Sequence, residues 1–327
     1  MAHIDHLTAF TEIPLVDMGP LVDGAPGAAR TVARDVGRHA TEVGFFYVKN
    51  HGVAPELIDD LLAAGRRFFA LPTEEKMRIR VNPLHRGYVT PGQAILSARA
   101  KPDFKESFVW GLELPPDDPD VRAGQPLMGP NQWPEGLPDL PVRVDRYFQA
   151  IMQCGLRLLR AVAVSLDLPE DFFDGRYRKP LARGALLHYP PQPESMGADQ
   201  FGSSAHTDYG CLTLLWQDAV GGLEVRNKAG QWIPAPPVPG TFVINLGDFM
   251  ARWTNDRFAS TPHRVVNRSG RERYSIPVFF DPDHDTVVEC LPSCQGPGQP
   301  PRYPPTTCGA YIKGRFDDVF VYRKIAD

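Results

Sequence analysis

Short β-forming segments dominate the second half of this chain of 327 residues. From Arg183 onward they follow one another, with turns that contain glycine or proline between them. The segments are GALLHY, CLTLLWQ, GLEVRN, QWIPA, TFVINLG, HRVVN, RYSIPVFF and TVVECL. About eight short strands at such a spacing are typical of a double-sheet jelly roll or a related barrel. The pattern therefore predicts a β-sheet domain for this half of the chain.

The first half and the C-terminal end show helical patterns instead. Apolar residues recur there at helical spacing. The expected helices are residues 26–43, 56–69, a short one beginning at Thr73, 142–166 and 311–322. Short strands are expected within residues 13–18 and 44–53, whereas residues 82–140 are less regular. The predicted class is α+β, mainly β, with a jelly-roll core flanked by helices from the N-terminal half and by a C-terminal helix.

Composition and charge argue against several classes of function. The net charge is −4 and no basic stripe is present, so we expect no nucleic-acid partner. No apolar run reaches the length of a membrane span, so we expect no membrane association. The first residues, MAHIDHLTAFTEIP, lack the features of a signal peptide, which makes the cytoplasm the expected location. The five cysteines are scattered and odd in number, so free thiols are expected.

Three side chains of the strand-rich half suit a metal ion. His206 and Asp208 lie two residues apart in an extended stretch, so both point to the same face. His263 lies in a later strand, and the strands between can return the chain to the same end of a barrel. Two imidazoles and one carboxylate on one face suit Fe(II) with open positions for other ligands. A zinc ion that supports hydrolysis at the same three residues is a weaker alternative.

A second pair of residues suits a bound carboxylate. Arg273 and Ser275 lie two residues apart in the segment RYSIPVFF, so they also share a face. A guanidinium and a hydroxyl together bind and orient a carboxylate. Because an apolar run follows Arg273, an inward-pointing arginine would need an anionic partner, and a bound dicarboxylate would provide one.

The motifs together resemble the isopenicillin N synthase-like branch of the Fe(II)/2-oxoglutarate-dependent dioxygenases. HTD, the distal PHRV and RYS occur in the order and spacing of that family. Further matching motifs are IPLVDM, GFFYVKNHGV, RGYVTPG, DFKESFVWG, HYPPQP, LLWQDAVGGLEV and FVINLGD. The resemblance covers nearly the whole chain and implies a double-stranded β-helix. It implies that residues 1–178 form a helix-rich region of the non-haem dioxygenase N-terminal type, which packs on a jelly-roll dioxygenase domain at residues 179–327.

The resemblance also implies roles for single residues. His206, Asp208 and His263 would bind Fe(II), and Arg273 with Ser275 would hold the distal carboxylate of 2-oxoglutarate. The family tyrosine that often approaches this cosubstrate matches Tyr189. Many members have asparagine two residues earlier, where this chain has Leu187, and this difference weakens the assignment of the tyrosine. The implied reaction uses dioxygen and couples oxidative decarboxylation of 2-oxoglutarate to hydroxylation, desaturation or cyclisation of a small-molecule substrate, with no catalytic side chain beyond the iron ligands.

The substrate pocket is less defined by the sequence. The resemblance places Phe279 at a position that often faces substrate. Aromatic residues of the N-terminal half would suggest an apolar or aromatic lining, while two arginines would instead suggest an anionic substrate. The aromatic candidates are Tyr88, Phe108 and Trp110, and the arginines are Arg99 and Arg183. Lys105 and Glu106 are expected to form a surface or inter-segment contact.

Other functions stay open at this point. Isopenicillin N synthase and the ethylene-forming plant oxidases share the arginine–serine motif but do not use 2-oxoglutarate as a cosubstrate. Another relative makes ethylene from 2-oxoglutarate itself. A non-catalytic ligand-binding module on the same scaffold is a further alternative, although such a module would not need all five polar groups.

Overall fold

The computed structural model describes residues 9–93, 103–191 and 201–324. Its helices are α1 (Gly19–Val22), α2 (Ala28–Glu42), α3 (Pro55–Phe69), α4 (Thr73–Met77), α5 (Pro119–Arg122), α6 (Leu140–Ser165), α7 (Asp248–Trp253), α8 (Cys308–Val319) and α9 (Val321–Lys324). Short 3-10 helices lie at Asp174–Arg176 and Pro292–Cys294. In the described part of the chain, no helix is both long and apolar enough to span a membrane.

The strands form two main sheets. They are β1 (Leu15–Asp17), β2 (Phe45–Lys49), β3 (Gly87–Val89), β4 (Glu106–Gly111), β5 (Arg183–Tyr189), β6 (Ser203–His206), β7 (Leu212–Gln217), β8 (Leu223–Arg226), β9 (Trp232–Pro234), β10 (Thr241–Leu246), β11 (His263–Val265), β12 (Arg273–Phe280), β13 (Val287–Val288) and β14 (Thr306–Thr307). The large sheet has the order β1-β2-β10-β7-β12-β5-β4-β3, and the small one β6-β11-β8-β9. A β13–β14 pair stands apart from both. Only β1 and β2 pair in parallel among these strands.

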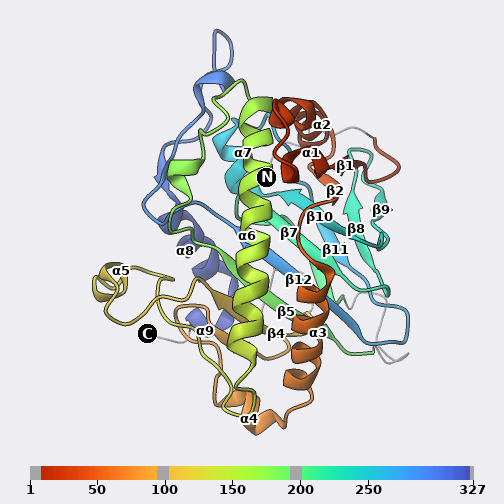
Figure 1. The fold of residues 1–327 in the computed structure, drawn as a ribbon, viewed down its shortest axis with the longest axis vertical. Coiled ribbons are helices and arrows are strands. Elements are labelled where there is room, and N and C mark those ends of the chain that lie inside the picture. Colours follow the sequence, from red (N-terminus) through yellow and green to blue (C-terminus); the bar gives the residue numbers. More distant parts are fainter. Residues whose placement is uncertain (1–8, 94–102, 192–200, 325–327) are drawn as a thin grey trace.

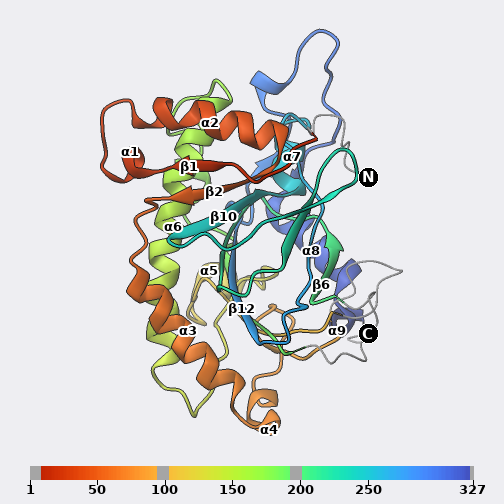
Figure 2. The ribbon, with the colours of Figure 1, turned by 90° about the vertical axis from the view of Figure 1, so that its right-hand side faces the viewer.

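The two faces of the large sheet pack against different layers. Phe46, Ile244 and Ile276 point to the helical layer, where they join the main apolar core with residues of α2, α3 and α6. Glycines allow the close approach, since a Cβ at Gly155 of α6 would lie 2.7 Å from the ring of Phe280. Figure 2 shows α3 and α6 on one side of this sheet and α8 and α9 on the other. The long α6 runs through most of the height of the molecule in Figure 1.

The opposite face of the large sheet points toward the small sheet. A second apolar core contains Phe45, Tyr47 and Val243 from the large sheet with Leu223 and Val225 from the small one. The alternation along β2 and β10 separates the two cores, because successive side chains of a strand point to opposite faces. Two facing sheets of this kind, antiparallel except for the β1–β2 pair, form the predicted jelly-roll core.

Several elements lie outside the sequence-based expectations. The strands β3 and β4 occupy the stretch that we expected to be irregular, and they extend the large sheet beyond β5. All six residues of β4 are buried. A strand that is covered on both faces lacks the alternation of apolar and polar residues that marks a half-exposed strand, which explains why it was missed. The helix α7, with six residues, is too short for a helical period to show.

Candidate functional site

A cavity lies on the inner face of the large sheet. Side chains of β4, β5, β7 and β12 line it from this sheet, and side chains of β6 and β11 line it from the small sheet. Phe316 of α8 and Phe320, which follows it, line the cavity from the C-terminal segment. The cavity contains the histidines, carboxylate, arginine and serine that the sequence singled out.

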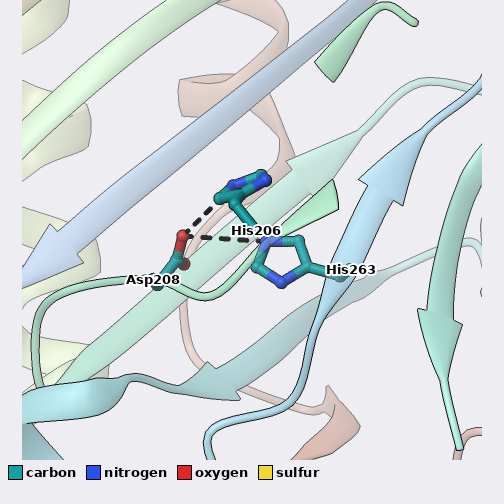
Figure 3. Close-up of side chains that lie close together, drawn as sticks. All are labelled: His206, Asp208 and His263. Carbon is teal, nitrogen blue, oxygen red and sulfur yellow. Dashed lines mark ion pairs between the residues drawn. The ribbon is translucent and has the colours of Figure 1, made fainter. Parts of the chain in front are cut away.

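The three predicted metal ligands come together inside this cavity. His206 ends β6 and His263 begins β11, and the two are direct cross-strand partners. Asp208 follows β6, and its Oδ1 lies 3.6 Å from His206 Nε2 and 3.7 Å from His263 Nε2. One ligand atom from each of the three residues lies within 4.8 Å of the others. Figure 3 shows both ring nitrogens facing the same carboxylate oxygen.

Hydrogen bonds leave the correct atoms free for a metal ion. Nδ1 of His206 lies 2.7 Å from the carbonyl oxygen of Ser204, and Nδ1 of His263 lies 3.2 Å from that of Thr261. A carbonyl oxygen only accepts, so each Nδ1 carries a proton, and in a neutral imidazole this arrangement leaves the lone pair on Nε2. Hydrogen bonds of this kind fix the ring orientation of metal-binding histidines.

The carboxylate of Asp208 is oriented in the same way. Its Oδ2 accepts hydrogen bonds from Thr213 Oγ1 at 2.5 Å and from Asn245 Nδ2 at 2.8 Å, which leaves Oδ1 for a metal ion. The backbone nearby is fixed by Gly247, where a Cβ would lie 2.7 Å from the carbonyl oxygen of Asp208. These contacts explain why the segment FVINLGD accompanies the metal motif.

The ionisation states also suit metal binding. Burial, together with the neighbouring His263, lowers the pKa of His206 to about 4, so its imidazole is neutral at neutral pH. Burial opposes ionisation of Asp208, but the two histidines and the hydrogen bonds from Asn245 and Thr213 outweigh it and lower the pKa of this carboxyl. A neutral imidazole and an ionised carboxyl are the forms of such side chains that bind a divalent cation without first losing a proton.

Arg273 lies fully buried in the cavity wall, with 0% of its surface exposed. Its Nε donates to the carbonyl oxygen of Gly221 at 2.5 Å and its Nη1 to Ser275 Oγ at 3.2 Å. The guanidinium stacks over the ring of Tyr189, 4.6 Å from the ring centroid. Among the residues described, none places a carboxylate within ion-pair distance of Arg273. A buried guanidinium without a counter-ion favours an anionic ligand at this place.

Of the aromatic pocket candidates, only Phe279 lines the cavity. The prediction was wrong for Tyr88, Phe108 and Trp110, which point to the opposite face of the sheet and belong to the main apolar core. Their neighbours along the strands line the cavity instead, because side chains alternate between faces. These neighbours are Val89, Ser107 and Val109.

The Tyr88 hydroxyl takes part in a buried polar cluster behind the sheet. It donates to Glu106 at 2.6 Å, and the same carboxylate contacts Lys76 Nζ and His188 Nδ1, each at 2.8 Å. Burial opposes the ionisation of Glu106, but the hydrogen bonds from His188, Lys76 and Tyr88 outweigh it and bring its pKa to about 2. Glu106 thus makes an inter-segment contact, as expected. Lys105 does so on the other face, where it lines the cavity.

Two further ion pairs involve side chains that line the cavity. Lys105 Nζ lies 2.7 Å from Asp103, whose other oxygen accepts from the backbone N–H and hydroxyl of Ser204 at 2.9 Å each. Arg183 Nη2 lies 2.8 Å from Asp281 Oδ2. Burial raises the pKa of Asp281, whereas the neighbouring Arg183 guanidinium acts in the opposite direction. The sequence did not indicate Asp103 or Asp281. Arg99 lies outside the described residues.

Comparisons with known proteins agree with this geometry. Residues 13–136 match the family described as the non-haem dioxygenase in morphine synthesis N-terminal, and residues 176–282 match the 2OG-Fe(II) oxygenase superfamily. A 2-oxoglutarate-Fe(II) type oxidoreductase of Emericella nidulans, hxnY, is 40% identical, with 94% of this chain and 90% of that protein covered. Kihadalactone A synthase of Citrus sinensis is 36% identical, with 95% of each chain covered.

Solved structures show the same similarity in three dimensions. A full-length Neurospora crassa protein in complex with alpha-KG and thymine is 29% identical and has a TM-score of 0.84, with 95% of this chain and 98% of that chain covered. The dioxygenase for auxin oxidation in rice is 29% identical with a TM-score of 0.71, and 94% and 96% of the two chains are covered. The expected jelly-roll core is therefore confirmed.

The relatives also confirm the class of chemistry. They are named as oxidoreductases and dioxygenases, and alpha-KG is bound in the related structures. The cofactor is Fe(II), the cosubstrate is 2-oxoglutarate and the oxidant is dioxygen, which react with a small-molecule substrate. The chain thus belongs to the 2OG-Fe(II) oxygenase superfamily, as an Fe(II)- and 2-oxoglutarate-dependent dioxygenase.

Proposed function

We propose that His206, Asp208 and His263 bind the Fe(II) ion. The observation that carries this proposal is how their polar atoms are engaged. Both Nδ1 atoms and Asp208 Oδ2 are hydrogen-bonded to neighbouring residues, while the remaining three atoms converge within 4.8 Å. Two histidines and one carboxylate on one side of an iron ion leave positions open for other ligands.

Arg273 and Ser275 bind the distal carboxylate of 2-oxoglutarate in this proposal. The guanidinium is buried, already hydrogen-bonded to Ser275, and without a carboxylate partner among the described residues. Tyr189 packs against its face and holds it in position. Because a planar guanidinium binds a carboxylate through two parallel hydrogen bonds, Arg273 fixes both the place and the orientation of the cosubstrate.

The iron ion and 2-oxoglutarate supply the oxidative chemistry: decarboxylation gives succinate and carbon dioxide, and a substrate C–H bond is hydroxylated. The chain contributes binding and geometry. Asp208 and the two histidines hold the metal side of the cavity, and Arg273 holds the opposite end of the cosubstrate. Apolar side chains from β12 and the C-terminal segment exclude water from the remaining space, where the substrate binds.

The substrate space lies between Phe279, Phe316 and Phe320. Thymine and 5-formyluracil, the ligands of the related Neurospora crassa structures, are small ring compounds, and a ligand of this size suits such a lining. We propose hydroxylation of a small ring-containing molecule. The place of the chain within the isopenicillin N synthase-like branch is a proposal that rests on the motifs HTD, PHRV and RYS.

An anaerobic titration tests the ligand assignment. Fe(II) followed by 2-oxoglutarate should give an optical charge-transfer band, and His206→Ala should abolish both the band and tight iron binding. His51→Ala is the matched control, since His51 is buried but does not line the cavity, and it should keep the band. Wild-type iron affinity in His206→Ala would remove this residue from the ligand set.

A further inference from the structure

The cavity contains two buried arginines with different charge environments. Arg273 has no carboxylate partner in the described part of the chain, whereas Arg183, only 4% exposed, pairs with the fully buried Asp281. The second oxygen of Asp281 accepts from the backbone N–H of Cys211 at 2.7 Å. The pair of Arg183 and Asp281 is therefore fixed within the fold, and its net charge is zero.

Arg183 nevertheless has an unused donor. Its Nε is buried and has no hydrogen-bond partner among the described residues, although the residue lines the cavity. The guanidinium lies 5.4 Å from the ring centroid of Phe279 and 4.6 Å from that of Phe316. Buried donors are almost always hydrogen-bonded in folded proteins, and leaving one unpaired is costly. An acceptor on a bound molecule would satisfy this N–H.

With Fe(II) and 2-oxoglutarate bound, the positive and negative charges around the cavity cancel without a charged substrate. This step rests on the function proposed above. Lys105 and Asp103 neutralise each other at 2.7 Å, as do Arg183 and Asp281. The distal carboxylate of 2-oxoglutarate neutralises the guanidinium of Arg273. Asp208 and the other carboxylate of the cosubstrate together match the two charges of Fe(II). A carboxylate or ammonium group on the substrate would then be buried without a counter-ion, which is unfavourable.

We infer that the substrate is an uncharged ring compound whose carbonyl or amide oxygen accepts a hydrogen bond from Arg183 Nε, and that Asp281 makes the site select against carboxylates. Arg183 alone would attract an anion. Once Asp281 neutralises it, the guanidinium acts as a hydrogen-bond donor and as a flat surface beside Phe279 and Phe316. The selection is thus set by a carboxylate that does not itself line the cavity.

The test uses the protein loaded with Fe(II) and 2-oxoglutarate under anaerobic conditions. The probes are aromatic carboxamides paired one to one with the matching carboxylates, beginning with benzamide and benzoate and extending to two-ring compounds. Dissociation constants come from saturation-transfer NMR titrations. We expect the carboxamides to bind at least about tenfold more tightly than their partners. Carboxylates that bind equally well or better, or a complete absence of carboxamide binding, would overturn the inference.

Two variants examine the residues separately. Asp281→Asn removes the counter-charge, so the preference should shift by about tenfold or more toward carboxylates. Arg183→Lys keeps the charge next to Asp281 but loses the Nε donor, so carboxamide affinity should fall about tenfold. Arg86→Lys is the matched control, because Arg86 is also buried with an unpaired Nε yet does not line the cavity. An Arg183→Lys variant with the wild-type preference would contradict the assignment.

The optical band of Fe(II) with 2-oxoglutarate separates this inference from the proposed function. If wild-type protein gives no band, the metal and cosubstrate assignments fail. If the band is normal but the carboxamide preference is absent, only the inference about the substrate fails. If Asp281→Asn loses the band, its fold or its metal site is disturbed, and the carboxamide affinity of Arg183→Lys decides the inference instead. Arg183→Lys leaves the contact between Asp281 and Cys211 in place.

Discussion

Replacing Arg273 by leucine should separate cosubstrate binding from metal binding. Arg273 is the one cationic side chain of the cavity that lacks a carboxylate partner among the described residues. Removing one partner of a buried charge pair costs about 3–5 kcal/mol, which corresponds to a loss of affinity of roughly two to nearly four orders of magnitude. Fe(II) affinity should change little, because no ligand atom contacts the arginine.

The same substitution should have little effect on the stability of the protein without ligands. Leucine loses the hydrogen bonds of Arg273 to Gly221, Ser275 and Gln217, but it also removes a buried charge that has no counter-ion. Replacing buried ionic groups by apolar residues of similar volume is often neutral for this reason. The defect of Arg273→Leu should therefore be confined to cosubstrate binding.

Ligand-dependent stability measures this defect. At a 2-oxoglutarate concentration of about 100 times the wild-type Kd, binding stabilises the folded protein by about 2.7 kcal/mol. A Kd that is about 100-fold weaker reduces this gain to about 0.4 kcal/mol at the same concentration. Urea unfolding of the metal-loaded protein, with and without 2-oxoglutarate, gives both values. Ser275→Ala should weaken the binding free energy of 2-oxoglutarate by only about 1 kcal/mol, because it removes a single neutral hydrogen bond. A variant of Arg273 that keeps the full 2-oxoglutarate-dependent gain would refute the assignment.

Three more perturbations examine the surroundings of the site. Thr213→Val removes one of the two hydrogen bonds that Asp208 Oδ2 accepts, so iron affinity in a chelator competition should fall about 10–100-fold, and an unchanged affinity would contradict a role of Thr213 in orienting the carboxylate. The pKa of Glu106 is about 2 in the folded protein, below its ordinary value, so its contribution to stability is present above about pH 4.5 and is lost as the pH falls toward 2. In urea unfolding from pH 5 to pH 2.5, the free energy of unfolding should therefore fall less steeply for Glu106→Gln than for the wild type. An equal slope in both proteins would exclude Glu106 as a cause of the acid sensitivity. Gly184→Ala, whose Cβ would lie 2.3 Å from Trp110, should destabilise the fold by about 1–3 kcal/mol in thermal unfolding, whereas Gly314→Ala, with no atom within 4 Å, should not.

The candidate metal site could be predicted from the sequence because it depends on strand periodicity. Two residues at i and i+2 share a face wherever the backbone is extended, and a jelly roll returns later strands to the same end. What the sequence could not show is the register that makes His263 the direct partner of His206. Nor could the sequence show that His206 Nδ1 is hydrogen-bonded to the carbonyl oxygen of Ser204, or that Asp208 Oδ2 accepts from Asn245. These contacts depend on the folded backbone.

The pocket lining was less accessible, and β4 shows the reason. The strand is buried on both faces, so its sequence carries no sign of which face meets the cavity. Large aromatic residues invite assignment to a substrate pocket, but Phe108 and Trp110 fill the core against the helices. The smaller Ser107 and Val109 line the cavity, which leaves room for a ligand there. Small side chains thus distinguish the face of β4 that lines the cavity from the face that packs in the core.

The two arginines show where sequence patterns stop being informative about chemistry. Arg183 and Arg273 begin neighbouring antiparallel strands of the same sheet, and both line the same cavity. Their different roles arise from Asp281, which follows β12 and lies next to Arg183 because Phe279 pairs with Arg183 across the two strands. Residues that are so distant in sequence become partners only through strand register. The cavity can therefore place a site that needs an anion beside a site that rejects one, although both use the same type of side chain.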